Sequence, residues 1–208
     1  MNQAVYLESS AWVKRYVAET GSAVLHALLE YAQAQSGQLI GSAWLGLAEV
    51  VAVLHRLANR RELGRAALAR LVRQLAADRQ LVRLLNLGEA DWAGVVELVA
   101  RHSLTAADAV HLQAALSWRA ELGGNPIVFV SADRRLLRAA HREGLAEFDV
   151  ERGDWAQLQE LLESDRGVLL HWDGQSARRS KRRRRGRSPV WGREGVCMLW
   201  LRNRSSCG

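Results

Sequence analysis

The sequence predicts an α/β fold with three layers, α/β/α, in which helices flank a central, mostly parallel sheet. Short apolar segments alternate along the chain with longer amphipathic segments that have helical spacing. Helical connections of this length favour right-handed crossovers between parallel strands. The segment Ile-Val-Phe-Val at 127–130 is apolar throughout, as is typical of a strand that is buried on both faces.

The expected elements follow from these two patterns in chain order. We expect strands at 4–7, 38–42, 81–87, 127–130 and, at one edge, 148–150. Helical spacing of apolar residues predicts helices at 9–17, 22–35, 43–59, 62–78, 89–102, 105–122, 133–143 and 155–163. Gly21 separates the first two helices, and the turn signal Gly-Gly-Asn-Pro at 123–126 precedes the buried strand. In such folds, ligands bind beyond the carboxyl ends of the strands.

Charge is distributed unevenly between the body of the chain and its last segment. The 208 residues carry a formal net charge of +7, with 29 basic and 22 acidic residues. Eleven of the basic residues and a single acidic residue lie in 176–208, which leaves 18 basic and 21 acidic residues before it. We therefore expect a main domain at 1–150, a C-terminal helix and edge at 151–175, and a basic, disordered tail at 176–208.

Two interpretations of the tail stay open. Its arginine run would suit nucleic-acid binding. Alternatively, it is an out-of-frame translation of GC-rich DNA, which we favour and which resequencing the locus would test. Both cysteines, Cys197 and Cys207, lie in this tail, so a disulfide framework and a thiolate metal site are excluded from the body. The chain contains no run of eighteen apolar residues and no signal-peptide pattern, so we expect a cytoplasmic protein without a membrane span.

Four carboxylates fall at positions where this fold would gather them. Glu8 directly follows the first expected strand, and Asp133 comes shortly after the buried strand 127–130. Glu49 lies in the helix after the second strand, and Asp108 lies in the first turn of the helix that Thr105 opens. Three of the four are expected at one edge of the sheet, and Glu49 can point toward that edge from its helix.

Each carboxylate also has a purely structural interpretation. Glu8 can be a helix-start acid, Asp108 can form a capping box with Thr105, and Asp133 can be an N-cap. The neighbours of Glu49 one turn away are mostly apolar, so its carboxylate is expected to be partly buried. Its structural alternative is a salt bridge to Arg56. The six histidines do not show a metal-ligand spacing.

The four carboxylates together favour a metal site. Gathered carboxylates repel one another, and we expect them to stay ionised only if a cation neutralises them. Hard divalent cations with oxygen ligands fit this set, namely Mg²⁺ or Mn²⁺. Such a site is suited to phosphoryl chemistry, in which the cation generates the attacking hydroxide from water.

At these carboxylates the sequence resembles the PIN-domain family, and within it the VapC-type toxins of bacterial toxin–antitoxin pairs. Segments that look like the four family motifs occur in the family's order, at 5–16, 47–50, 104–112 and 129–136. The third, Leu-Thr-Ala-Ala-Asp-Ala-Val-His-Leu, is the most specific. The resemblance extends over roughly the first 150 residues and does not include the tail.

The resemblance implies a PIN-like three-layer fold and a metal-dependent endoribonuclease. Glu8, Glu49, Asp108 and Asp133 would take the family's acidic positions and hold one or two Mg²⁺ ions, with Ser9 and Ser131 as supporting hydroxyls. Cleavage would leave a 5′-phosphate and a 3′-hydroxyl. The resemblance also implies an RNA substrate, a cognate antitoxin protein that blocks the site, and a homodimer. Separately from the resemblance, basic residues near the expected edge are candidates for contacts with RNA phosphates, although a solvated face is the better interpretation for any single one: Lys14, Arg15, Arg134 and Arg135.

One residue departs from the family pattern, because the first acid is normally Asp and here it is Glu8. The extra methylene moves the carboxylate outward by about 1.5 Å, and Mg²⁺ demands nearly ideal geometry. An alternative function is therefore a catalytically impaired PIN-fold protein that acts as a binding or decoy partner. A phosphatase is less favoured, because Glu8-Ser9-Ser10 does not supply a nucleophilic Asp after the first strand.

Overall fold

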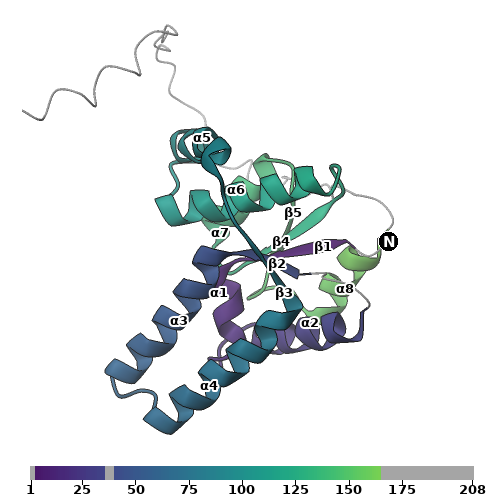
Figure 1. Ribbon diagram of the computed structural model, residues 1–208. Helices are drawn as coiled ribbons and strands as arrows, with labels where there is room; N and C mark the ends of the chain where they lie inside the picture. Colours follow the sequence, from purple (N-terminus) through teal and green to yellow (C-terminus); the bar gives the residue numbers. More distant parts are fainter. Residues whose placement is uncertain (1–2, 36–39, 165–208) are drawn as a thin grey trace, which may run out of the picture. The chain divides into compact units, whose positions relative to one another are not determined.

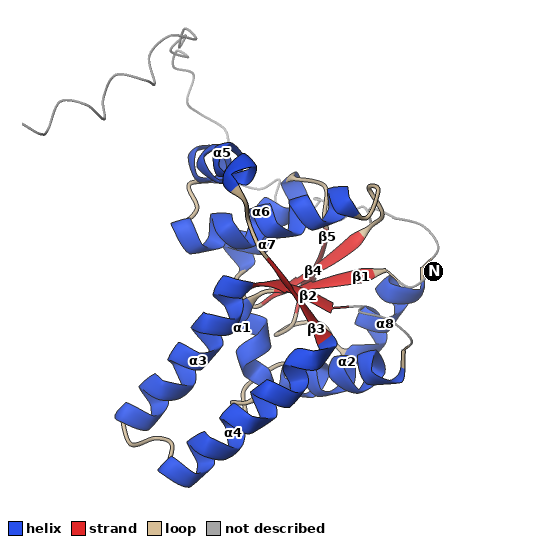
Figure 2. Ribbon diagram, viewed as in Figure 1, coloured by secondary structure: helices blue, strands red, loops and turns tan. Residues whose placement is uncertain are grey.

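The computed structural model describes residues 3–35 and 40–164, which form a five-stranded, all-parallel sheet flanked by helices (Figure 2). The strands are β1 (Ala4–Leu7), β2 (Ile40–Ala43), β3 (Val82–Leu85), β4 (Ile127–Ser131) and β5 (Ala146–Asp149). Their order in the sheet is β3-β2-β1-β4-β5, and all four neighbouring pairs are parallel. The predicted fold class is thereby confirmed, and the sheet is parallel throughout rather than mostly so.

Helices occupy both faces of this sheet (Figure 1). The α-helices are α1 (Ser9–Trp12), α2 (Ser22–Ala34), α3 (Trp44–Asn59), α4 (Arg65–Asp78), α5 (Trp92–His102), α6 (Ala106–Glu121), α7 (Arg134–Arg142) and α8 (Trp155–Glu163). Three short 3-10 helices add η1 (Val13–Arg15), η2 (Arg79–Leu81) and η3 (Glu89–Asp91). These elements follow the predicted order, although the segments 9–17 and 89–102 each divide into a 3-10 turn and an α-helix.

The side-chain alternation of the strands creates two separate cores. On β1, Val5 and Leu7 face one side of the sheet and pack with α1, α2, α3, α4 and α8. Tyr6 faces the other side, where it packs with residues of α5, α6 and α7. Successive side chains of a strand point to opposite faces, so one strand supplies both cores. This arrangement places α3 and α6 in different helical layers.

The order of the strands creates a switch point beside β1. From β1 the chain adds β2 and then β3 on one side, and it later returns to add β4 and β5 on the other side. Ligand sites in open parallel sheets lie at such a reversal, beyond the carboxyl ends of the strands. Glu8 follows β1 there, and Ser131 ends β4. The fold thus brings together two of the segments that the sequence analysis singled out.

Several expectations lie partly or wholly outside the described residues. These are the start of the second strand at 38–39, residues 165–175 and the whole tail at 176–208. The division of the chain at residue 150 stays a prediction, and Leu158 and Leu162 of α8 pack into the same core as β1. Within 3–35 and 40–164, no helix has the length and apolar character that crossing a membrane requires.

Candidate metal centre

Glu8 lies at the point where β1 ends and α1 begins. Its backbone N–H donates to the Val130 carbonyl at 3.0 Å, which continues the pairing of β1 with β4 past the end of the strand. Its side chain caps α1 by accepting from the backbone N–H of Ser10 at 3.0 Å. The helix-start role considered for this residue is therefore present. The residue is 5% exposed, so its carboxylate needs partners from the protein or from a bound cation.

Three serine hydroxyls supply partners for the Glu8 carboxylate. Ser9 donates to Oε1 at 2.7 Å, Ser131 donates to Oε2 at 2.8 Å, and Ser10 also donates to Oε2. Two of these hydroxyls are themselves oriented by backbone amides. The hydroxyl of Ser10 accepts from Ala132 N–H at 3.0 Å.

Ser131 is oriented in the same way, because its hydroxyl accepts from Asp133 N–H at 2.9 Å. A hydroxyl that accepts from an amide directs its own hydrogen elsewhere, and here that direction is Glu8. The carboxylate is thus held by donors of its own chain, and two of them are the hydroxyls of Ser9 and Ser131 that the family resemblance named as supporting.

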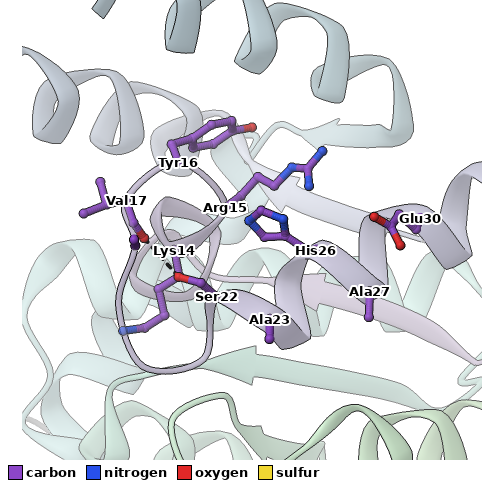
Figure 3. Close-up of a pocket in the computed structure, with 10 residues that line it drawn as sticks. Lys14, Arg15, Tyr16, Val17, Ser22, Ala23, His26, Ala27 and Glu30 are labelled. Carbon is purple, nitrogen blue, oxygen red and sulfur yellow. Dashed lines mark hydrogen bonds between the residues drawn. The ribbon is translucent and has the colours of Figure 1, made fainter. Parts of the chain in front are cut away.

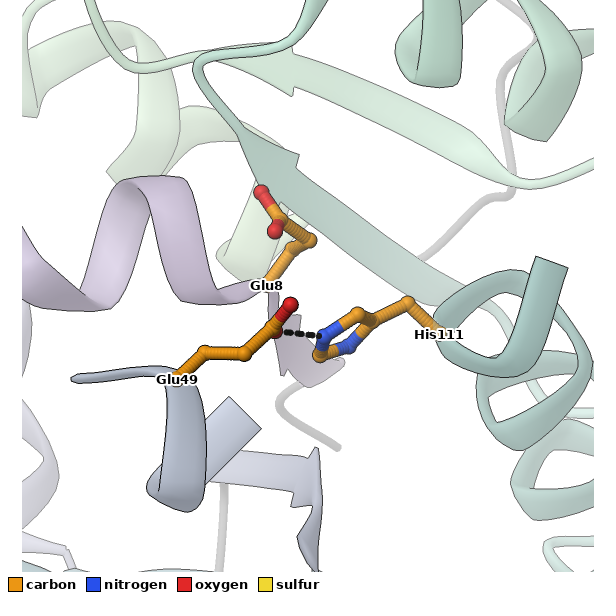
Figure 4. Close-up of side chains that lie close together, drawn as sticks. All are labelled: Glu8, Glu49 and His111. Carbon is orange, nitrogen blue, oxygen red and sulfur yellow. Dashed lines mark hydrogen bonds and ion pairs between the residues drawn. The ribbon is translucent and has the colours of Figure 1, made fainter. Parts of the chain in front are cut away.

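Glu49 approaches Glu8 from α3. Its Oε2 lies 2.8 Å from Nε2 of His111, a residue of α6 (Figure 4). The hydrogen bond with His111 holds the pKa of Glu49 below its usual range, although burial raises it, and Ser9 and the charge of Arg56 lower it further. The predicted alternative partner, Arg56, therefore acts at longer range, and His111 makes the direct contact.

His111 is itself held from its other ring nitrogen. Its Nδ1 lies 2.8 Å from the Tyr6 hydroxyl, and that hydroxyl accepts from the backbone N–H of Ala43 at 3.2 Å. Burial raises the pKa of Tyr6 well above its usual value, with Glu8 and Glu49 adding to the effect, so the phenol keeps its proton. Sequence reasoning missed this contact. A buried histidine on an apolar helix face was the available signal, since such a ring needs polar partners.

Ligand atoms of Glu8, Glu49 and His111 all lie within 4.8 Å of one another. Figure 4 shows Glu49 and His111 facing each other, with Glu8 beside them. Two carboxylates at this separation suit a hard divalent cation, whose remaining ligands can be waters and a substrate phosphate. The donor chemistry therefore fits Mg²⁺ or Mn²⁺. The cluster includes two of the four carboxylates that the sequence singled out.

Asp108 and Asp133 lie outside this three-residue cluster, and each caps a helix. Asp108 forms a capping box with Thr105, in which the two residues exchange bonds of 3.2 and 3.3 Å. Asp133 accepts from Arg135 N–H at 2.7 Å and from Leu136 N–H at 3.2 Å. Both aspartates are half-buried. Their predicted role as ligands stays a prediction, while the capping roles are observed.

A pocket of about 480 Å³ adjoins the cluster. Its lining includes Ser9, Ser10, Glu49, Lys14 and Arg56. The pocket provides space for a substrate beside the carboxylates. One lining cation is already engaged, because the buried Nζ of Lys14 lies 2.8 Å from Glu151 and 3.1 Å from Glu19.

A second pocket, of about 530 Å³, lies against η1 and α2, and Figure 3 shows Arg15, Tyr16 and His26 around it. Arg15 forms an ion pair with Asp78 at 3.0 Å, and both side chains are mostly buried. This pairing commits the guanidinium of Arg15 to the fold. Arg134 and Arg135 are exposed at the start of α7, so they are accessible to a ligand.

Comparison with known proteins agrees with the fold and with the sequence motifs. The model of the PIN domain matches residues 5–142. The chain belongs to the PIN-domain family. It is also 33% identical over 140 residues to two proteins of Mycobacterium tuberculosis, Ribonuclease VapC45 of strain CDC 1551 / Oshkosh and Ribonuclease VapC49 of strain ATCC 25618 / H37Rv. Each alignment covers 67% of this chain and 91% of the relative.

A solved structure supports the PIN-domain fold independently. The crystal structure of PAE2754 from Pyrobaculum aerophilum matches with a TM-score of 0.50 and 22% sequence identity. The match covers 77% of this chain and 96% of that protein. At this identity the similarity concerns the fold alone.

We predict that Ser131→Ala destabilises the protein by about 1–3 kcal/mol, because it removes one donor from a buried carboxylate. Ser42→Ala is a matched control. The Ser42 hydroxyl is equally buried near the end of β2 and makes no hydrogen bond with the described residues. Urea unfolding should show a loss for Ser131→Ala and little change for Ser42→Ala. Equal effects would contradict the role of Ser131.

We predict that Glu49 stabilises the fold in a pH-dependent way. Its pKa in the folded protein lies below the ordinary value of 4.5, so its contribution is fully present above that value and is lost as pH falls through the lowered pKa. The measurement is the free energy of unfolding of wild type and Glu49→Gln across acidic pH. The difference between them should shrink below about pH 4.5, and a constant difference would refute the prediction.

Proposed function

We propose that this PIN-domain protein is a Mg²⁺-dependent endoribonuclease and the toxin of a type II toxin–antitoxin pair. One observation carries the proposal. Glu8 and Glu49, which are far apart in sequence, bring carboxylate oxygens within 4.8 Å at the switch point of the sheet. The similarity to two VapC ribonucleases supports RNA cleavage as the reaction that this pair of carboxylates would serve.

Glu8 and Glu49 would hold the cation, with Asp108 and Asp133 as proposed further acids. When bound, Mg²⁺ or Mn²⁺ would lower the pKa of a water molecule and stabilise the negative charge that develops on the phosphate. The contribution of the chain is to fix its ligands in advance. Serine donors orient Glu8, and His111 orients Glu49. Ligands fixed in this way lose little entropy when the reacting groups assemble.

The pocket beside the cluster would receive the RNA backbone. Arg56 lines this pocket, is exposed, and forms none of the ion pairs found among residues 3–35 and 40–164. Its guanidinium is therefore available to a phosphate, for which arginine offers two parallel donors. Arg134 and Arg135 could extend such contacts along the strand, and Lys14 would mainly set the local charge. Arg15 is committed to Asp78 and is the weakest of the predicted contacts.

The proposed partners follow from the family. They are an RNA substrate, a cognate antitoxin that blocks the site, and a second copy of the chain in a homodimer. A cytoplasmic location fits this role.

The direct test is cleavage of RNA by the purified protein with Mg²⁺ or Mn²⁺. We expect Glu49→Gln and Glu8→Gln each to lower the cleavage rate by about 100-fold or more. Loss of a residue that only supports a metal ligand typically costs about 10- to 100-fold, and loss of a ligand itself should cost at least the upper figure. Glu89→Gln changes an exposed carboxylate of η3 and should leave the rate unchanged. Cleavage that survives both substitutions in the cluster would refute the proposed site.

A second function follows from the engagement of Glu8. Its carboxylate already has four donors, and it stands where the family usually has Asp. A protein impaired by this glutamate would act as a binding or decoy partner. It would show no cleavage as wild type and would gain activity on Glu8→Asp.

A further inference from the structure

We propose that His111 is a positioning residue, which Tyr6 holds in the tautomer with its hydrogen on Nε2, and which orients Glu49 without binding the cation. The inference deepens the proposed function, because it rests on Glu49 being a ligand. It also determines the chemistry of the ligands. The cation would have oxygen ligands, with no nitrogen from the imidazole.

The direction of each hydrogen bond in this series can be worked out from its first member, which is a group that can only donate. The backbone N–H of Ala43 points at the Tyr6 hydroxyl oxygen at 3.2 Å. The hydroxyl therefore accepts there and has its own hydrogen to donate. The other partner that the described residues give this hydroxyl is Nδ1 of His111, at 2.8 Å. The hydrogen of Tyr6 thus points to Nδ1, which must be the unprotonated nitrogen of the ring.

The proton of the neutral ring then lies on Nε2. That nitrogen is 2.8 Å from Oε2 of Glu49, so it donates to a carboxylate. With hydrogen on Nδ1 instead, the Tyr6 oxygen would face two donors, and its own hydrogen would have no acceptor in a fully buried place. If Nε2 lacked its hydrogen, its lone pair would also face the carboxylate oxygen. Every donor therefore meets an acceptor only when the hydrogen bonds run in one direction, from Ala43 through Tyr6 and His111 to Glu49.

Packing keeps the ring in this orientation. His111 is 1% exposed, and Tyr6 meets it edge-on, with an interplanar angle of 80°. Tyr6 is in turn stacked on Phe129, with ring centroids 5.1 Å apart. On the other side, a Cβ at Gly46 would lie 3.0 Å from Cε1 of His111, so glycine is what allows α3 to approach the ring. The imidazole therefore has little freedom to turn Nε2 away from Glu49.

The contact with His111 engages one oxygen of the Glu49 carboxylate. Oε2 receives the His111 hydrogen, and Ser9 also donates to this carboxylate. A cation between Glu8 and Glu49 would bind where these donors leave the carboxylate oxygens available. Residues that hydrogen-bond a metal ligand typically contribute about 10- to 100-fold in metal affinity. Oxygen ligands favour Mg²⁺ and Mn²⁺, whereas an imidazole ligand would favour Zn²⁺, Ni²⁺ or Cu²⁺.

The tautomer of His111 can be measured without an assay of ribonuclease activity. Long-range ¹H–¹⁵N NMR spectra of the full-length protein distinguish protonated from unprotonated ring nitrogens, and the His111→Gln spectrum identifies the His111 signals among the six histidines. We expect Nε2 to be protonated and Nδ1 unprotonated at neutral pH. Tyr6→Phe should disturb this pattern, because it removes the hydrogen that Nδ1 accepts. A protonated Nδ1 in the wild type would overturn the proposal.

The positioning role is tested by titrating Mn²⁺ into variants. We expect His111→Ala to weaken Mn²⁺ binding by about 10- to 100-fold. His111→Gln should recover much of this loss, because its side-chain amide can still donate toward Glu49. His55→Ala is the control, since His55 is an exposed residue of α3. Thermal unfolding of each variant separates loss of binding from loss of fold.

The outcomes also separate this inference from the proposed function. Equal losses for His111→Ala and His111→Gln, with Zn²⁺ bound more tightly than Mn²⁺ by the wild type, would make His111 a ligand and overturn the proposal. Unchanged Mn²⁺ affinity in a destabilised His111→Ala would reduce the residue to a structural role. If the wild type cleaves no RNA but shows the expected tautomer and rescue, the ribonuclease is rejected and the positioning role stands.

Discussion

The burial of the Glu8 carboxylate between β1 and β4 is the constraint on which the site depends. A buried charge without partners is costly, so the chain must place donors around it. The serines that follow Glu8 and the serine that ends β4 do so, and the amides after β4 orient two of these hydroxyls. The pairing of β1 with β4 therefore builds the surroundings of the carboxylate as well as the sheet.

The second carboxylate connects the two helical layers. Glu49 comes from α3, on one face of the sheet, and His111 comes from α6, on the other. They meet at the carboxyl edge, where no strand separates them. Tyr6 extends this connection into the core of its own face. The position of Glu49 is thus determined by the packing of both layers against the sheet, and not by α3 alone.

Local patterns in the sequence predicted much of this structure. Short apolar segments located the strands to within a few residues, and the spacing from Thr105 to Asp108 predicted a capping box that the structure contains. The strand ends also indicated where Glu8 would lie. The contact between His111 and Glu49 was not predictable in this way, because 62 residues separate them and 105 separate Tyr6 from His111. Packing between the helical layers brings such partners together, and this packing produces no periodic pattern in the sequence.

We propose that Glu8 and Glu49 form a divalent-cation site whose ligands are oriented by donors of the chain itself. The most direct measurement is X-ray diffraction from crystals of the protein grown with Mn²⁺, using the anomalous signal of the metal to locate it. We expect an anomalous peak between the carboxylates of Glu8 and Glu49, with Nε2 of His111 still bonded to Glu49. A peak elsewhere, or none at saturating Mn²⁺, would contradict it.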